Sequence, residues 1–220
     1  NKATNHNKGL KVLEKYAKMF GFDTTSGLSD AEYEPIISTK DAVRSTIGQG
    51  NNSYTPSQIS RYLTTLVNQR NCYDLNLVNK VKDTKGKTAL KNKAKVHNKI
   101  NISSATWDAV YKGMYGVVNG SHSSIDQFFK DLNVKVAGKT GTAQENLKKP
   151  NHALFISFAP YSNPKICTTV VIPNGYTSSN AAELASRVYK YYFAESKTEK
   201  DKVLKNAFNT QGGNFSARTD

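Results

Sequence analysis

Four consecutive residues combine a positive charge with two hydroxyls: Lys139, Thr140, Gly141 and Thr142. They lie in VKVAGKTGTAQ, residues 134–144, which we predict to be a β-strand. Because side chains alternate across a strand, Thr140 and Thr142 share one face and Lys139 points to the other. Two hydroxyls at this spacing fit a carboxylate, and Lys139 would place positive charge beneath it.

Glycine weakens the interior of a strand, so the presence of small residues in this strand requires an explanation. Gly138, Gly141 and Ala143 would leave room for another chain to lie alongside. On an edge strand, unpaired backbone N–H groups can bind an extended peptide by strand addition. One such N–H, directed at a substrate carbonyl, would supply one of the two donors of an oxyanion hole. The alternative is an edge strand with a glycine bulge, in which Lys139 only discourages aggregation.

Helical periodicity predicts the elements that precede this strand. A first helix, with its apolar side chains on one face, ends at Gly21. A second begins after Thr55, an N-cap, with Pro56 in its first turn and Gln58 completing a capping box. A third begins near Ile102 and Ser103. The apolar stripes are Leu10, Leu13, Ala17 and Phe20; Ile59, Tyr62, Leu63, Leu66 and Val67; and Trp107, Val110, Met114, Val117 and Val118.

Further strands are predicted at residues 75–81, 152–161 and 165–173, with a lysine-rich connection at residues 82–99. We interpret the lysine-rich stretch at residues 80–99 as a solvated loop and hairpin. The short link Ser162-Asn163-Pro164 makes the last two strands an antiparallel hairpin. A final helix begins near Asn180 and carries Leu184, Val188, Tyr191 and Tyr192 as its apolar residues. Helices first, then consecutive strands, predict an α+β fold in which helices flank an antiparallel sheet.

The composition fits one core of ordinary size, with 220 residues and 37% hydrophobic content. We interpret residues 1–208 as one domain and residues 209–220 as a polar tail. The net charge of +14 could mark a surface for nucleic acid, an anionic polymer or a membrane. The lysines are scattered, however, and their densest stretch lacks aromatic residues, so we expect a solvated surface and no nucleic-acid partner.

The cysteines and histidines give no sign of a metal or cofactor site. Cys72 and Cys167 are far apart and form no Cys-x-x-Cys pair, and the four histidines have no metal-ligand spacing. No apolar run approaches the length that spans a bilayer. The N-terminus is polar, so any export or anchoring signal is expected outside this chain.

The longer context of the lysine strand resembles a known family. AGKTGTAQ resembles the third signature motif of the penicillin-binding proteins and serine β-lactamases. Three other stretches resemble, in order, the class B penicillin-binding proteins, and the resemblance covers about residues 10–193. These stretches are KYAKMFGFDTTSGLSDAE, STIGQGNNSYTPSQISRYLTTLVN and HALFISFAPYSNPKI.

The resemblance implies the transpeptidase fold of that family and D,D-transpeptidation of peptidoglycan stem peptides through an acyl-serine intermediate. Carried over by position, Lys139 and Thr142 would be catalytic. Lys139 would take part in proton transfer, and the backbone N–H of Thr142 would bind the oxyanion. The Thr140 and Thr142 hydroxyls would hold the carboxylate of a substrate or β-lactam antibiotic. Gly141 would keep the strand clear for substrate.

The family's nucleophile is missing from the expected place. The resemblance implies Ser-x-x-Lys and Ser-x-Asn motifs before the lysine motif. The formal matches, Ser162 with Lys165 and Ser178 with Asn180, lie after it in the wrong elements. We therefore interpret the chain as the C-terminal half of a transpeptidase domain that lacks the serine-bearing N-terminal half and does not acylate alone.

The resemblance also implies partners and a location. The expected partners are stem peptides, β-lactams, the N-terminal half of the domain and other cell-wall synthesis proteins. The expected location is the outer face of the bacterial cell membrane, with an anchor outside this chain. The alternative function is a β-lactam sensor or non-catalytic binding module with the same fold.

Overall fold

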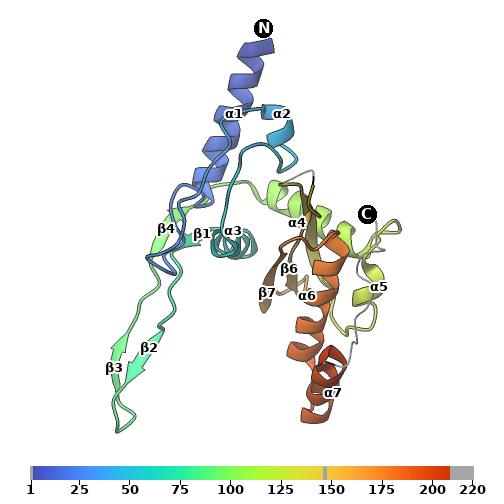
Figure 1. The fold of residues 1–220 in the computed structure, drawn as a ribbon. Coiled ribbons are helices and arrows are strands. Elements are labelled where there is room, and N and C mark those ends of the chain that lie inside the picture. The colour runs from blue at the N-terminus through green and yellow to red at the C-terminus, as the bar shows by residue number, and fades with distance from the viewer. Residues whose placement is uncertain (1, 146–147, 209–220) are drawn as a thin grey trace. The chain divides into compact units, whose positions relative to one another are not determined.

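The computed structural model describes residues 2–145 and 148–208 (Figure 1). The chain divides into two compact units, Asn1–Asn101 and Ile102–Asp220, which we call the N-terminal and C-terminal units and describe separately. That both units belong to one domain over residues 1–208 stays a prediction. The predicted polar tail at residues 209–220 lies outside the described residues.

Three helices of the N-terminal unit are α1 (Lys2–Met19), α2 (Ala42–Ser45) and α3 (Pro56–Asn68). The first predicted helix is confirmed, and the chain turns after it at Gly21, whose φ is +84°. A Cβ at Gly21 would lie 2.7 Å from Cys72 Sγ and 2.8 Å from Arg61 Nε. This glycine is therefore required both by the backbone conformation and by close packing.

The predicted start of α3 is also confirmed. Thr55 Oγ1 accepts the Gln58 backbone N–H at 3.2 Å, and Gln58 Oε1 accepts the Thr55 N–H at 2.9 Å, which completes the capping box. Leu63 and Leu66 of its apolar stripe are buried, with 1% and 2% exposure. The cap and the stripe together fix this helix in the N-terminal unit.

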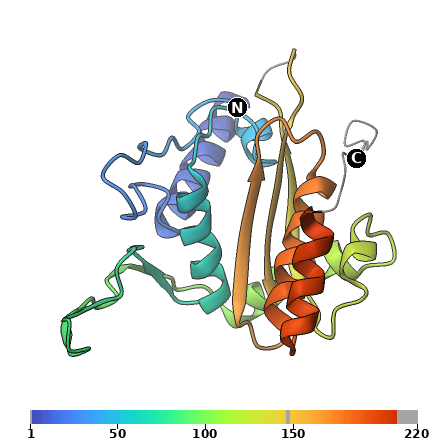
Figure 2. The ribbon, with the colours of Figure 1, turned by 60° about the horizontal axis from the view of Figure 1, so that its bottom comes forward.

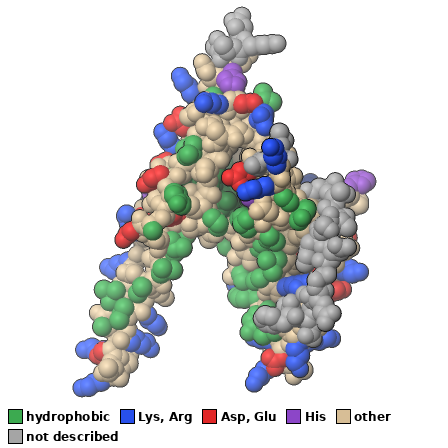
Figure 3. All heavy atoms as spheres, in the orientation of Figure 1, with side chains coloured by type: hydrophobic (Ala, Val, Ile, Leu, Met, Phe, Trp, Pro, Cys, Tyr) green, Lys and Arg blue, Asp and Glu red, His purple; other side chains and the backbone are tan. Residues whose placement is uncertain are grey.

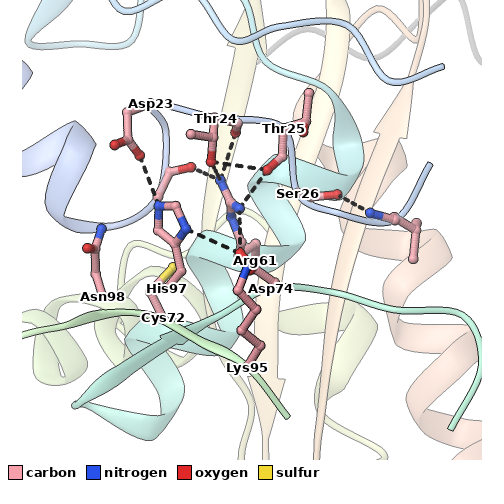
Figure 4. A network of polar contacts seen from close by, with 12 residues as sticks. Asp23, Thr24, Thr25, Ser26, Arg61, Cys72, Asp74, Lys95, His97 and Asn98 are labelled. Atoms are coloured by element: carbon pink, nitrogen blue, oxygen red, sulfur yellow. Dashed lines mark hydrogen bonds and ion pairs between the residues drawn. The ribbon is translucent and has the colours of Figure 1, made fainter. Parts of the chain in front are cut away.

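Arg61, on the same helix, is the centre of a buried polar network (Figure 4). Its side chain is fully buried and donates to the carbonyl oxygens of Gly21, Thr24 and Thr25. Asp74 Oδ1 lies 3.6 Å from Arg61 Nη1. Because the guanidinium presents its donors in a rigid fork, one side chain holds several carbonyls of the loop that follows α1.

The predicted strand at residues 75–81 is wrong. Residues 75–79 form no strand, and the regular pairing lies on either side, in β1 (Asn71–Tyr73) and β2 (Lys80–Lys82). β1 pairs with β4 (Val96–Lys99), while β2 pairs with β3 (Thr88–Lys91). Leu77 is 78% exposed, so the apolar residues that suggested a strand have no core to pack against.

The predicted lysine-rich hairpin is confirmed as β2 and β3, and it is solvated. All seven strand residues are exposed, and Lys80 lies directly opposite Lys91. Figure 3 shows hydrophobic and lysine side chains side by side along this part of the chain. A two-stranded ribbon without a core is only marginally stable alone, so its pairing contributes little to the N-terminal unit.

The C-terminal unit contains one antiparallel sheet with the strand order β5-β6-β7. The strands are β5 (Ala137–Ala143), β6 (His152–Ala159) and β7 (Ile166–Ile172), and the predicted β6–β7 hairpin is confirmed. The helices are α4 (Ser104–Asn119), α5 (Asp126–Phe129), α6 (Ser178–Phe193) and α7 (Lys197–Phe208). The predicted helix start near Ile102 and Ser103 is confirmed, and Ser103 is the N-cap of α4.

Helices lie against both faces of this sheet, so the predicted α+β fold with a flanked antiparallel sheet is confirmed. α6 packs along β6 and β7 (Figure 2), and its Tyr189 ring approaches the core around Phe155 and Phe129. Phe158 points to the other face, where its ring centroid lies 4.8 Å from that of Tyr111 in α4. No helix of the described ranges is long and apolar enough to cross a membrane.

One polar cluster lies inside this core. The Tyr189 hydroxyl on α6 lies 2.9 Å from Ser157 Oγ on β6 and 3.2 Å from Thr168 Oγ1 on β7. Burial raises the pKa of Tyr189 to about 12, so the hydroxyl stays protonated and links the helix to both strands.

The helix predicted to begin near Asn180 is confirmed as α6, and several of its large apolar residues lie outside its buried face. The residues that the sequence singles out are 40–49% exposed: Leu184, Val188, Tyr191 and Tyr192. The buried face consists mostly of small residues, with Ala181, Ala182 and Ala185 at 0% exposure beside Tyr189. Alanine lets the helix approach the sheet closely, and only the aromatic ring fills the remaining space.

Candidate functional site

The candidate site residues all lie on β5, at one edge of the sheet. Each has a partner on β6: Lys139 opposite Ile156, Thr140 opposite Phe155, Gly141 opposite Leu154 and Thr142 opposite Ala153. Among the described strands, β5 is paired on this one side only, since β6 and β7 follow it in the sheet. The strand therefore brings the charge and the two hydroxyls together within one exposed edge.

The two faces of β5 carry different chemistry. Thr140 and Thr142 share the face of Phe155, whereas Lys139 and Gly141 lie on the opposite face. Thr140 is half-buried, and within the described residues its hydroxyl makes no hydrogen bond. The Lys139 side chain is exposed, and its Nζ donates to the Thr140 carbonyl oxygen at 2.8 Å.

The two glycines of the strand have different roles, and the expected clearance at Gly138 is wrong. Gly138 is buried, and a Cβ there would lie 2.5 Å from Phe155 Cζ and 2.8 Å from the Ile156 carbonyl oxygen. Its missing side chain makes room for the protein's own core. At Gly141 a Cβ would meet only Leu154 Cβ, at 3.4 Å, so this position is not filled by the core.

A cavity of about 310 Å³ lies beside Thr140. Its lining consists of Gly116 and Val117 on α4, residues 120–125 of the following loop, and Thr140 itself. Ser123 fixes the loop, because its Oγ donates to the Val117 carbonyl at 2.8 Å and accepts the Ile125 N–H at 3.3 Å. We call this feature the Thr140 cavity.

Sequence reasoning missed the Thr140 cavity. The stretch GMYGVVNG suggested only a helix with an apolar stripe. The sequence signal that could have indicated the cavity was the pair Gly113 and Gly116, because glycine is unfavourable within a helix. A Cβ at either position would meet nothing within 4 Å.

Other chemically capable residues lie away from β5. Ser162 is exposed in the β6–β7 turn, and Ser178 is the first residue of α6, as expected for chance matches to the serine motifs. Burial raises the pKa of the Cys72 and Cys167 thiols, which disfavours the nucleophilic thiolate. Over residues 2–145 and 148–208, no three His, Cys, Asp or Glu side chains are grouped to hold a metal ion.

Comparison with known proteins places most of the chain in one family. The sequence profile described as "Penicillin binding protein transpeptidase domain" matches residues 2–190. A curated relative, "Peptidoglycan D,D-transpeptidase MrdA" of Haemophilus influenzae, is 35% identical over 219 residues, which cover 85% of this chain and 33% of the relative. The protein of the same name from Escherichia coli K12 is 30% identical, over 77% of this chain and 31% of its own length.

A solved structure shows the same fold. "Crystal structure of Pseudomonas aeruginosa PBP2 in complex with WCK 5153" aligns with a TM-score of 0.71 and 26% identity. The alignment covers 86% of this chain and 45% of the other. The chain spans about a third of the length of these curated relatives.

Proposed function

The chain belongs to the penicillin-binding protein transpeptidase family, and we propose that it is part of a class B enzyme that cross-links peptidoglycan stem peptides through an acyl-serine intermediate. The observation that carries this proposal is the edge strand β5, which presents Lys139, Thr140 and Thr142 together within the matched range. The chain supplies the substrate-binding strand, and the nucleophilic serine comes from elsewhere in the parent protein.

We assign the carboxylate of the stem peptide, or of a β-lactam, to the hydroxyls of Thr140 and Thr142. Both lie on one face of β5, and hydroxyl groups are suitable donors to a carboxylate. Lys139 adds positive charge at the same edge and takes part in proton transfer once the serine half is in place. Gly141 carries no side chain there, which leaves the strand open to an extended substrate.

The Thr142 N–H is assigned to the oxyanion hole. In a strand, the carbonyl and N–H groups of residues two apart point to the same lateral side. Lys139 Nζ donates to the Thr140 carbonyl oxygen at 2.8 Å. This contact is expected if the Thr140 carbonyl points away from β6, at the outer edge of β5. The same geometry would direct the Thr142 N–H outward, toward the carbonyl of a docked substrate.

The serine-bearing N-terminal half of the domain is the proposed partner of the C-terminal unit. β7 is the other outer strand of the sheet, and α6 exposes a series of apolar side chains. Both features are suited to further strands and helices of the same domain. Without that half we expect no acylation, and we place the parent enzyme on the outer face of the cell membrane with other cell-wall synthesis proteins.

Labelled penicillin tests this function on the full-length parent protein. We expect covalent labelling of a serine outside this chain, identified by mass spectrometry of the labelled peptide. Thr140→Val should lower the acylation rate constant by about 10- to 100-fold, since a hydrogen bond to a charged group is lost. Thr169→Val is the matched control, because Thr169 lies on β7 and its buried hydroxyl has no partner in the described structure.

Two outcomes would contradict the proposal. Labelling of Ser162 in the isolated chain would show that the nucleophile was misassigned. Labelling of the parent without cross-linking of stem peptides would favour a β-lactam sensor.

A further inference from the structure

The Thr140 cavity adjoins the proposed carboxylate site and is unexplained by the roles assigned to β5. Thr140 is part of its lining, so a ligand whose carboxylate is held at Thr140 has the cavity directly beside it. We propose that the Thr140 cavity is a substrate subsite that accepts a polar part of the stem peptide and is not needed for β-lactam binding. This inference rests on the proposed function of β5.

The side chains around the cavity are suited to a peptide. Ser121, His122 and Ser124 are exposed, and none of these three side chains makes a hydrogen bond within the described part of the chain. Hydroxyl and imidazole groups can donate and accept, so they complement amide and carboxylate groups better than aliphatic ones.

The shape of the cavity is fixed by the fold. Asn119 Nδ2 donates to the Val136 carbonyl at 2.8 Å, which ties the end of α4 to the segment before β5. The Gly120 N–H donates to the Gly116 carbonyl at 2.9 Å, and a Cβ at Gly120 would lie 2.5 Å from that oxygen. The loop therefore keeps its position without a ligand, as expected of a preformed subsite.

Gly116 provides a direct way to fill the cavity. It lies within α4, lines the cavity and would place a Cβ in open space. Gly113, one turn earlier in the same helix, would also place a Cβ in open space but does not line the cavity. Leucine at either position raises helix propensity, so the two variants differ mainly in the cavity.

The experiment compares Gly116→Leu with Gly113→Leu in the full-length parent enzyme. Thermal unfolding first establishes that both variants fold. Acylation by labelled penicillin and kcat/KM for a stem-peptide substrate are then measured for each. We expect Gly116→Leu to keep the penicillin acylation rate and to lose on the order of tenfold in kcat/KM for the peptide, as for an obstructed pocket. Gly113→Leu should leave both values unchanged.

A second variant does not depend on filling the cavity. His122→Ala removes an exposed polar side chain, which should not affect folding, and should lower kcat/KM for the peptide while sparing penicillin acylation. Equal peptide kinetics for both leucine variants, or loss of penicillin acylation in Gly116→Leu alone, would overturn the subsite. Failure of the unmodified parent to react with penicillin would instead refute the proposed function.

Discussion

Replacing Gly138 by alanine should destabilise the C-terminal unit, although it adds a single methyl group to a strand. The new Cβ would lie 2.5 Å from Phe155 Cζ, 2.8 Å from Phe155 Cε2 and 2.8 Å from the Ile156 carbonyl oxygen. Ordinary carbon contacts begin near 3.5 Å, so each of these distances requires movement. Phe155 is fully buried in the core, and the Ile156 carbonyl belongs to the paired strand β6.

The expected cost follows from what must move. A ring in a close-packed core can shift only by displacing its neighbours, among them Phe129, whose centroid lies 5.8 Å from that of Phe155. Overpacking of this kind costs about 1–3 kcal/mol. With a urea m value of about 2 kcal/mol/M, a loss of about 2 kcal/mol lowers the urea midpoint by about 1 M.

Urea unfolding followed by the fluorescence of Trp107 measures this effect. Trp107 is the only tryptophan of the chain and is 5% exposed in α4, so it reports on the C-terminal unit. Gly141→Ala is the matched control on the same strand, because its Cβ would meet only Leu154 Cβ, at 3.4 Å. Its midpoint should stay unchanged or rise slightly. Equal midpoints for the two variants would refute the assignment of Gly138 to core packing.

Two further predictions concern the N-terminal unit. Desolvation raises the pKa of Glu32, but hydrogen bonds from Ser57, Thr55 and Ser26 outweigh it, so the pKa lies below its ordinary value of 4.5. The ionised Glu32 carboxylate therefore stabilises the fold fully at pH values above 4.5, and this stabilisation is lost as the pH falls through the lowered pKa. Glu32→Gln should destabilise most at neutral pH and least below about pH 4, which thermal unfolding across this pH range measures, and an effect that does not diminish at low pH would contradict the prediction. Arg61→Lys should lower the free energy of unfolding by about 2 kcal/mol or more, because lysine cannot reach the Gly21, Thr24 and Thr25 carbonyls together. Far-UV circular dichroism in urea tests this, and an equal effect of the exposed Arg70→Lys would contradict it.

Local signals predicted the positions of several elements. The cap at Thr55 and the turn at Gly21 depend on a few neighbouring residues, so the helices they bound were found correctly. The strand expected at residues 75–81 was wrong because Leu77 and Val78 belong to no strand and are 78% and 46% exposed, so no core covers them. Pairing between distant segments, such as β1 with β4, leaves no periodic signal in either segment alone.

Packing between elements was less predictable than the elements themselves. Periodicity gives weight to large apolar residues, so it selected Leu184 and Val188 and overlooked the alanines that α6 buries. The alternation of Lys139 and Thr140 across β5 followed from strand geometry alone. The reason for Gly138 did not, because it depends on the ring of Phe155, which is distant in the sequence.

The exposed β2–β3 ribbon has a practical consequence for handling the protein. Its lysines are accessible to trypsin, and cleavage at Lys85 or Lys87 would break no contact of the buried core. The two resulting fragments would remain joined through the pairing of β1 with β4. The tip of the ribbon is thus a natural place to nick the chain, or to insert an affinity tag, without disturbing the strand that carries Lys139.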